Sequence, residues 1–280
     1  MATAESRHQS EFRFQSDGAV RFLAAASARR TSIQNDWSRT QSELQAIWPR
    51  KGHAVVAIVH EGDGCLDGED ANDVLELLHG LRPDEPLDVI LHTHGGSAAA
   101  ANRIAAALVK RRNTAAFVPF YAESAGTEVA LATQQIYFGR DANLSPIDIH
   151  IDGTSARDIV HLASEKGGSA SEGLRLAAKV ARRALHDEAR TVASLIHPDH
   201  KKAGPTALAA KLTGGRCYHG ELIRIARARR LGINAKNGVP AVLYGFIGKR
   251  RAQLRQLREL EQNLGFIRRR EPAQDESVRA

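Results

Sequence analysis

Two turns rich in small residues carry the groups of this chain that best fit chemistry on a carbonyl carbon. The first is HGGS, residues 94–97, and the second is AESAGT, residues 122–127. Each turn follows a short apolar run and precedes a stretch with helical periodicity. Glycine permits tight turns and close backbone approach, and the start of a helix exposes backbone N–H groups. The two turns therefore offer donors to a negatively charged oxygen.

Ser124, in the second turn, has two interpretations. Its side chain can cap the helix that follows, as serine commonly does. It can also be a nucleophile held on a sharp strand-to-helix turn, where small neighbours leave room for a substrate. A tetrahedral oxyanion needs two fixed donors at about 3 Å, and the backbone N–H groups of Gly96 or Ser97 and of Ala125 can supply them. Taken together, the two turns shift the balance toward the nucleophile.

The elements around these turns alternate between strand and helix. Strands are predicted at residues 53–60, 87–94 and 114–120, and helices at 19–48, 69–81, after the glycine turn, after Ser124 and at 171–196. This alternation predicts an α/β fold in which helices flank a parallel sheet. Ligands of such sheets bind where the C-terminal ends of strands meet the following helices, and both turns fall there.

Four blocks of the chain resemble the serine dehydrogenase proteinase family, which is related to signal peptide peptidase A and, more distantly, to the Clp protease and crotonase fold. The blocks are LDVILHTHGG (87–96), VPFYAESAGT (118–127), LSPIDIH (144–150) and LTGGRCYHG (212–220), the last followed by RLGI (230–233). The resemblance implies a Clp protease/crotonase-like fold. It also implies a serine endopeptidase that cleaves peptides or unfolded proteins through an acyl-enzyme on Ser124, with Gly96 and Ser97 lining the oxyanion hole. No cofactor is expected.

The base that activates the serine has three candidates. A base must lie within hydrogen-bond reach of the hydroxyl, and a third group usually fixes its tautomer. His219 is the first choice, because the resemblance to Clp protease puts the triad acid close to this block, and Asp148 is then its orienting group. His150 is the rival, because side chains two apart on a strand point the same way and it can share a face with Asp148. Lys179 is the third candidate, by resemblance to the serine and lysine dyad of signal peptide peptidase A, although its helix is dense with Lys and Arg.

Four residues depart from the family pattern, and they motivate a second hypothesis. They are His94, Glu123, Ser145 and Gly220, where the family has Pro, Met, Gly and Asp. An acidic Glu123 opposes ionisation of the serine if its side chain faces the site. The alternative function is a weak or inactive member of the family that binds peptides or acts as a scaffold. A crotonase-type acyl-thioester enzyme is a third alternative, but a serine nucleophile is superfluous for that chemistry.

Length and composition indicate the class of protein, its location and its division into domains. The chain has 280 residues, of which 42% are hydrophobic and 25% are charged, as in ordinary globular proteins. No window approaches the roughly 18 apolar residues of a membrane span. Cys65 and Cys217 are too few for a disulfide framework, so a cytoplasmic location is expected. We expect a polar and helical extension over residues 1–50, a peptidase domain over 51–245, and a basic helix with a disordered tail over 246–280.

The net charge of +7 is concentrated in the last quarter of the chain. The arginines are spaced among Leu and Ile as on the solvent-exposed face of amphipathic helices. No aromatic residues are interleaved with them for base stacking, so no nucleic-acid partner is expected. Leucines at positions 254, 257, 260 and 264 form a stripe. By resemblance we expect a homo-oligomer in which this helix takes part, the rival being contact with an anionic membrane.

The histidines at 92, 94, 197 and 200 form no compact set of three ligands, so no metal site is expected. Cys217 has no base near it in the sequence and is expected to be buried.

Overall fold

The computed structural model describes residues 42–200, 204–214 and 221–270, together with positions 25, 28, 29, 31 and 32; the side chains of residues 261 and 263–270 are not described. The chain forms two compact units. One unit is Trp48–Ile247, and the other combines Met1–Ile47 with Gly248–Ala280. The expected division into residues 1–50, 51–245 and 246–280 stays a prediction. The expected disordered tail and the residues His219, Gly220 and Cys217 lie outside the described residues.

The larger unit is built on a five-stranded sheet with the order β1-β2-β3-β5-β10. Its strands are β1 (Ala54–Val59), β2 (Leu87–His92), β3 (Thr114–Val118), β5 (Gln135–Phe138) and β10 (Ala235–Asn237). All neighbouring strands pair in parallel. Every residue of β2 and β3 is buried, which explains why the two strands are continuous runs rather than alternating patterns. The predicted parallel sheet is therefore confirmed.

The third predicted strand is two residues too long. β3 ends at Val118, and the next residue is Pro119. Proline has no backbone N–H to donate to the ladder, so the strand stops before it. The chain then enters a smaller sheet that the sequence did not predict, of order β4-β6-β9. Its strands are β4 (Tyr121–Ala122), β6 (Asn143–Leu144) and β9 (Ile223–Arg224).

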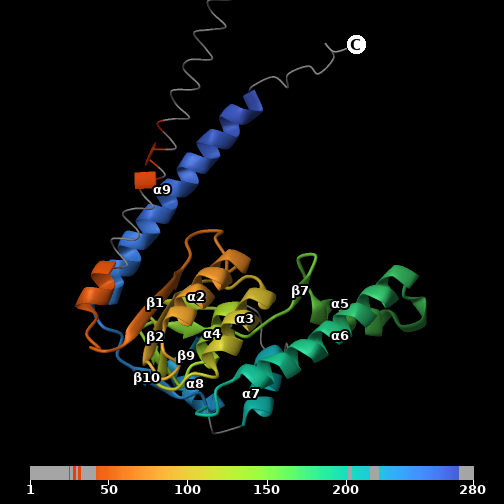
Figure 1. Ribbon diagram of the computed structural model, residues 1–280. Helices are drawn as coiled ribbons and strands as arrows, with labels where there is room; N and C mark the ends of the chain where they lie inside the picture. Colours follow the sequence, from red (N-terminus) through yellow and green to blue (C-terminus); the bar gives the residue numbers. More distant parts are fainter. Residues whose placement is uncertain are drawn as a thin grey trace, which may run out of the picture. The chain divides into compact units, whose positions relative to one another are not determined.

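Helices α2 (Gly68–Gly80), α3 (Ala98–Leu108) and α4 (Ala125–Leu131) follow β1, β2 and β4 and pack beside the sheet (Figure 1). The Asp67 side chain starts α2 by accepting hydrogen bonds from two N–H groups of the first turn. Helix α3 buries small side chains, among them Ala101 and Ala105, and this brings its backbone close to its neighbours. All seven residues of α4 are buried. These helices were expected from their periodicity.

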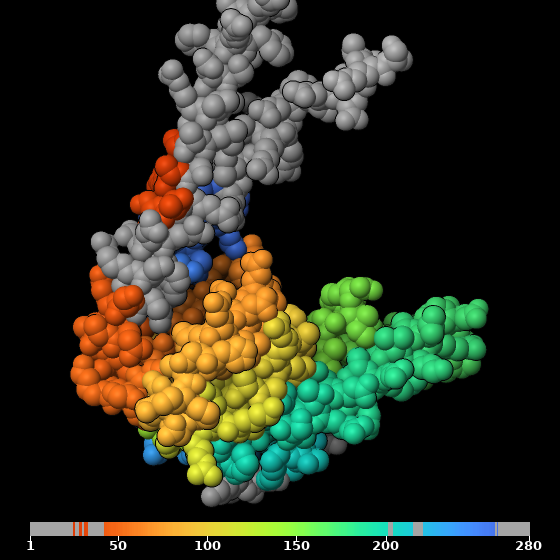
Figure 2. All heavy atoms as spheres, in the orientation of Figure 1, coloured from red at the N-terminus to blue at the C-terminus, as the bar shows by residue number. Residues whose placement is uncertain are grey.

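A helical hairpin extends from the sheet and its helices (Figure 1 and Figure 2). It consists of α5 (Ala156–Lys166) and α6 (Glu172–Leu195), joined by a short turn at Gly167–Ser169. The strand pair β7 (His150–Ile151) and β8 (Thr154–Ser155) leads into it. The helix predicted at 171–196 is confirmed as α6, whereas α5 was not predicted. Helices α7 (Pro205–Thr213) and α8 (Ile225–Leu231) complete this unit.

The smaller unit contains residues 42–47, which are helical, and the part of α9 (Val242–Arg270) from Gly248 onward. Within this unit Leu44 and Leu260 are buried, and Lys249 Nζ lies 3.6 Å from Glu43 Oε2. The leucine stripe of the basic helix is thus covered in part. Among the described helices, none combines the length and the apolar character needed to cross a membrane.

Candidate active site

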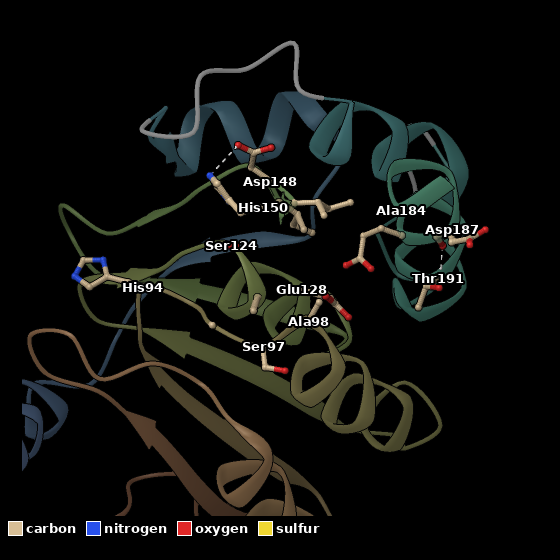
Figure 3. A pocket seen from close by; sticks show the side chains of 15 residues that line it. His94, Ser97, Ala98, Ser124, Glu128, Asp148, His150, Ala184, Asp187 and Thr191 are labelled. Atoms are coloured by element: carbon tan, nitrogen blue, oxygen red, sulfur yellow. Dashed lines mark hydrogen bonds and ion pairs between the residues drawn. The ribbon is translucent and has the colours of Figure 1, made fainter. Parts of the chain in front are cut away.

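A cavity of about 660 Å³ opens beside the C-terminal ends of the central strands (Figure 3). Four segments line it: the glycine turn after β2, the start of α4, the segment that leads to β7, and one side of α6. The lining residues used below are Gly96, Ser97, Ser124, Ala125, Glu128, Asp148, His150, Asp187 and Glu188. The two turns predicted to face one crevice therefore do so.

The glycine pair is required by the close approach of backbone segments. Gly95 has φ +104°, and a Cβ added to it would lie 2.8 Å from Glu123 O and 2.9 Å from Ser124 Cβ. Gly96 has φ +148°, and its Cβ would lie 2.3 Å from Leu66 O. No other residue fits at either position without moving the backbone. The pair therefore lets the glycine turn touch the serine turn.

Ser124 has a strained backbone, with φ +50° and ψ −118°. Its side chain makes no capping hydrogen bond to α4, so the capping interpretation does not apply here. Its N–H donates to Ser145 Oγ at 2.8 Å. Conformations of this kind persist only where surrounding contacts hold them, and they gather at functional sites. Ser124 therefore presents its hydroxyl to the cavity on a turn that the fold holds in place.

Hydrogen bonds of Thr127 and Ser145 support the serine turn. Thr127 Oγ1 lies 2.8 Å from Ala122 O and accepts a hydrogen bond from Ser145 N–H at 3.1 Å. Both side chains are buried. This link joins the serine turn to the segment that carries Asp148. Sequence reasoning noted Ser145 only as a departure from the family and missed its supporting role.

The backbone N–H groups of Gly96 and Ala125 are available as donors at the cavity. They donate to no residue that the structure describes, and both residues line the cavity. Ser97 differs, because its N–H donates to Leu66 O at 2.8 Å and its hydroxyl accepts from Ala100 N–H at 3.3 Å. The backbone N–H of Ser97 is therefore already used by Leu66 O. Of the two alternatives in the glycine turn, Gly96 is the available donor.

Glu123 does not line the cavity. Its carboxylate lies 2.7 Å from His94 Nδ1 and accepts a hydrogen bond from Asn143 Nδ2 at 2.8 Å. The His94 ring stacks on Tyr121 with a centroid separation of 4.2 Å. Glu123 was expected to oppose ionisation of Ser124 only if its side chain faced the site. Because His94 and Asn143 hold the carboxylate away from the cavity, this condition is not met.

Asp148 and His150 share one side of their segment, as predicted. His150 Nε2 lies 3.6 Å from Asp148 Oδ2, and Ser155 Oγ donates to Asp148 Oδ1 at 3.2 Å. Figure 3 shows this pair on the segment opposite the start of α4, which carries Ser124. Both residues line the same cavity as Ser124. The serine, an imidazole and a carboxylate thus line one cavity.

The other two candidate bases are His219 and Lys179. His219 lies outside the described residues, so its role stays a prediction. Lys179 is exposed on α6 and is absent from the cavity lining. It is therefore not positioned to deprotonate Ser124 within one copy of the chain.

Two glutamates at the cavity were missed by sequence reasoning. Glu128, on α4, is 1% exposed, and neither of its carboxyl oxygens has a hydrogen-bond partner among the described residues. Burial, with a smaller contribution from Glu188, raises the pKa of Glu128 to about 8. Burial also raises the pKa of Glu188, on α6. The available signal was the single charge in the apolar stretch AGTEVAL, where Glu128 stands one helical turn after Ser124.

The two histidines of HPDH have structural roles. His200 is buried, its Nε2 lies 2.9 Å from Thr133 O, and its Nδ1 accepts a hydrogen bond from Asn234 N–H. Burial lowers the pKa of His200 to about 4, which keeps the ring neutral and suits this pair of bonds. Burial also lowers the pKa of His197. Within the described part of the chain, no three His, Cys, Asp or Glu residues form a group suited to a metal ion.

Relatives of the chain were found among curated proteins. The chain is 31% identical over 213 residues to the uncharacterized protein MJ0137 of Methanocaldococcus jannaschii, covering 72% of this chain and 74% of that protein. It is 26% identical over 212 residues to the uncharacterized protein MJ1495 of the same organism, covering 72% and 73%.

Solved structures with a similar fold include a mutant of ClpP1 from Listeria monocytogenes and a mutant of the 1510-N membrane-bound stomatin-specific protease. The first has 14% identity and a TM-score of 0.42, and covers 67% of this chain and 92% of that chain. The second has 15% identity and a TM-score of 0.44, and covers 69% and 82%.

A family model extends over both turns, the segment with Asp148 and His150, and helix α6, which lines one side of the cavity. It describes ClpP-like SDH-type serine proteinases and matches residues 52–265, which is most of the chain. The chain belongs to the ClpP-like SDH-type serine proteinase family.

Proposed function

We propose that the protein is a serine peptidase that hydrolyses peptide bonds through an acyl-enzyme on Ser124. The observation that carries this proposal is the meeting of two turns at one cavity. The strained serine turn presents a hydroxyl that donates to no described residue, and the N–H groups of Gly96 and Ala125 beside it are available as donors. A nucleophile and two preorganised donors are the groups that acyl transfer requires.

The reaction proceeds in two halves. Ser124 Oγ attacks the carbonyl carbon of the substrate while a base takes the hydroxyl proton, and the carbonyl oxygen becomes an oxyanion that accepts from Gly96 N–H and Ala125 N–H. The C–N bond then breaks, and the leaving amine takes the proton from the base. A water molecule, deprotonated by the same base, attacks the acyl-enzyme, which releases the acid and restores the serine.

The base that this geometry favours is His150, with Asp148 as its orienting group. The pair lies at 3.6 Å and lines the cavity with Ser124. A carboxylate on one ring nitrogen fixes the tautomer and stabilises the imidazolium that forms when the other nitrogen takes the serine proton. His219 remains the rival base.

A fluorophosphonate probe tests the nucleophile, because it bonds covalently to activated serines. We expect the parent protein to be labelled and Ser124→Ala to lose at least 100-fold of the labelling. Ser97→Ala is the matched control, because Ser97 lines the same cavity and its loss removes only a helix cap, which costs about 1 kcal/mol. Equal labelling of Ser124→Ala and the parent would remove the proposal. No labelling of a folded parent would leave the alternative of a peptide-binding or scaffold protein.

A further inference from the structure

The cavity beside Ser124 contains an acidic patch that the hydrolytic reaction does not use. It consists of Glu128, from α4, and Glu188, from α6. Both oxygens of Glu128 and the Oε1 of Glu188 are buried and have no hydrogen-bond partner among the described residues. In Figure 3, Glu128 lies between the glycine turn and the side of α6 that carries Ala184, Asp187 and Thr191.

The other ionisable residues at the cavity have partners. Asp148 lies near His150, His94 bonds Glu123, and Asp187 Oδ2 lies 3.7 Å from Arg183 Nε. Neither Lys nor Arg occurs among the residues that line the cavity. The two glutamates are therefore acidic groups that face one cavity from two helices without a cation from the described chain.

Buried carboxyl groups without partners are costly, and a ligand that supplies donors and positive charge removes the cost. The planar guanidinium of arginine has five donors, enough for two carboxyl groups at once. Glu128 is four positions after Ser124, which corresponds to about 6 Å at the rise of an α-helix. An arginine or lysine side chain spans a distance of this size.

We propose that Glu128 and Glu188 form a specificity subsite for a cationic side chain, arginine or lysine, of the peptide residue whose carbonyl Ser124 attacks. This inference rests on the proposed function for the position of the scissile bond. The acidic patch itself stands independently, because it is defined by the cavity and not by the chemistry of the serine.

Binding of a cation to this patch is coupled to proton release. Burial raises the pKa values of both glutamates, that of Glu128 to about 8, so Glu128 carries a proton near neutral pH. A guanidinium favours the ionised carboxylates, and the proton leaves when it binds. Affinity for a permanently charged guanidinium therefore rises as the pH increases toward and past 8. Asp148, Asp187 and the two histidines that line the cavity, His94 and His150, face the same space.

Benzamidine is the probe, with neutral benzamide as its isosteric control, and both are titrated calorimetrically into the full chain between pH 6 and 9. We expect benzamidine to bind at least 10-fold more tightly than benzamide, and more tightly at pH 9 than at pH 6. Glu128→Gln and Glu188→Gln, which keep side-chain size, should each weaken benzamidine at least 10-fold. The exposed Glu165→Gln on α5 should leave it unchanged.

Labelling by the uncharged fluorophosphonate separates this inference from the proposed function. If Ser124 is labelled but benzamidine neither binds nor slows labelling, the acidic subsite is refuted while the peptidase stands. If benzamidine binds through Glu128 but Ser124 is not labelled, the subsite stands and the peptidase falls. Tight binding of Ca²⁺ or Mg²⁺ that benzamidine does not displace would also overturn the subsite. Thermal melts of the variants verify that each is folded.

Discussion

Gly95 is a residue at which one added methyl group should damage the contact between the glycine turn and the serine turn. The added Cβ would collide with Glu123 O and Ser124 Cβ, and the φ of +104° is unfavourable for alanine. We expect Gly95→Ala to lose at least 100-fold of the fluorophosphonate labelling and about 1–3 kcal/mol of unfolding free energy. Labelling with the probe and chemical denaturation measure the two effects.

Gly52→Ala is the control for this prediction. Gly52 also has a positive φ, +79°, but a Cβ there would meet no atom within 4 Å. This variant should therefore lose some stability and keep its labelling. Equal loss of labelling in both variants would show that general destabilisation, and not the contact of the two turns, explains the effect.

Substitution of the two candidate histidines tests which residue deprotonates Ser124. If His150 takes the serine proton, His150→Ala should lower the rate of labelling at least 100-fold, with His219→Ala much milder. Asp148→Asn should lower the rate as well, because it weakens the hold on the ring. The reverse ranking of the two histidine variants would assign the role to His219.

Helix α4 combines a nucleophile at its start with a buried carboxyl one turn later. The pKa of Glu128 rises on folding from 4.5 to about 8, so the folded state binds its proton more tightly than the unfolded state does. The favourable contribution is complete below pH 4.5 and is lost as the pH rises through 8. Glu188 adds to the effect, because burial raises its pKa too.

Glu128→Gln removes this titration. We expect the melting temperature of the variant to improve relative to that of the parent between pH 5 and pH 9, by several degrees for each 1 kcal/mol of relative stability. Paired thermal melts across this range measure the difference, and Glu165→Gln serves again as the exposed control. A constant difference between variant and parent would mean that Glu128 is ionised throughout.

At the scale of the whole molecule, we propose that the chain is a homo-oligomer and that α9 takes part in its assembly. The part of α9 in the smaller unit has Leu260 buried, and Leu254 and Leu257 are only half-buried. Because the smaller unit covers the leucine stripe of α9 only in part, the stripe can pack against a second copy of the chain. The rival role is peripheral contact between its arginines and an anionic membrane.

A chain that ends at Ile247, the last residue of the larger unit, tests the proposal. Light scattering should show a smaller assembly than that of the full chain. Flotation with phosphatidylserine vesicles should give the same result for both chains. An intact oligomer with loss of vesicle binding would assign α9 to the membrane. The apolar residues exposed on the α5–α6 hairpin, Leu162, Leu176 and Val180, would then be the surface to examine for assembly.

The sequence by itself determined the features that depend on neighbours along the chain. Hydrophobic periodicity predicted three of the five parallel strands and most of their helices, because each element buries one recurring set of side chains. The glycine pair and Ser124 were identifiable because small residues at two strand-to-helix turns can expose backbone N–H groups and a hydroxyl to one crevice. The proximity of Asp148 and His150, the rival to the pairing of Asp148 with His219, was predictable because the period of an extended chain places alternate residues on one side.

Tertiary structure alone decided the features that depend on segments distant along the chain. Gly96 rather than Ser97 is the available donor because Leu66, from another loop, accepts the N–H of Ser97. Glu123 turns from the nucleophile because His94 and Asn143 hold its carboxylate. The acidic patch exists because α6 packs near α4 and brings Glu188 to Glu128. Burial and partners set the charge and role of such groups, and no local pattern encodes either before the chain has folded.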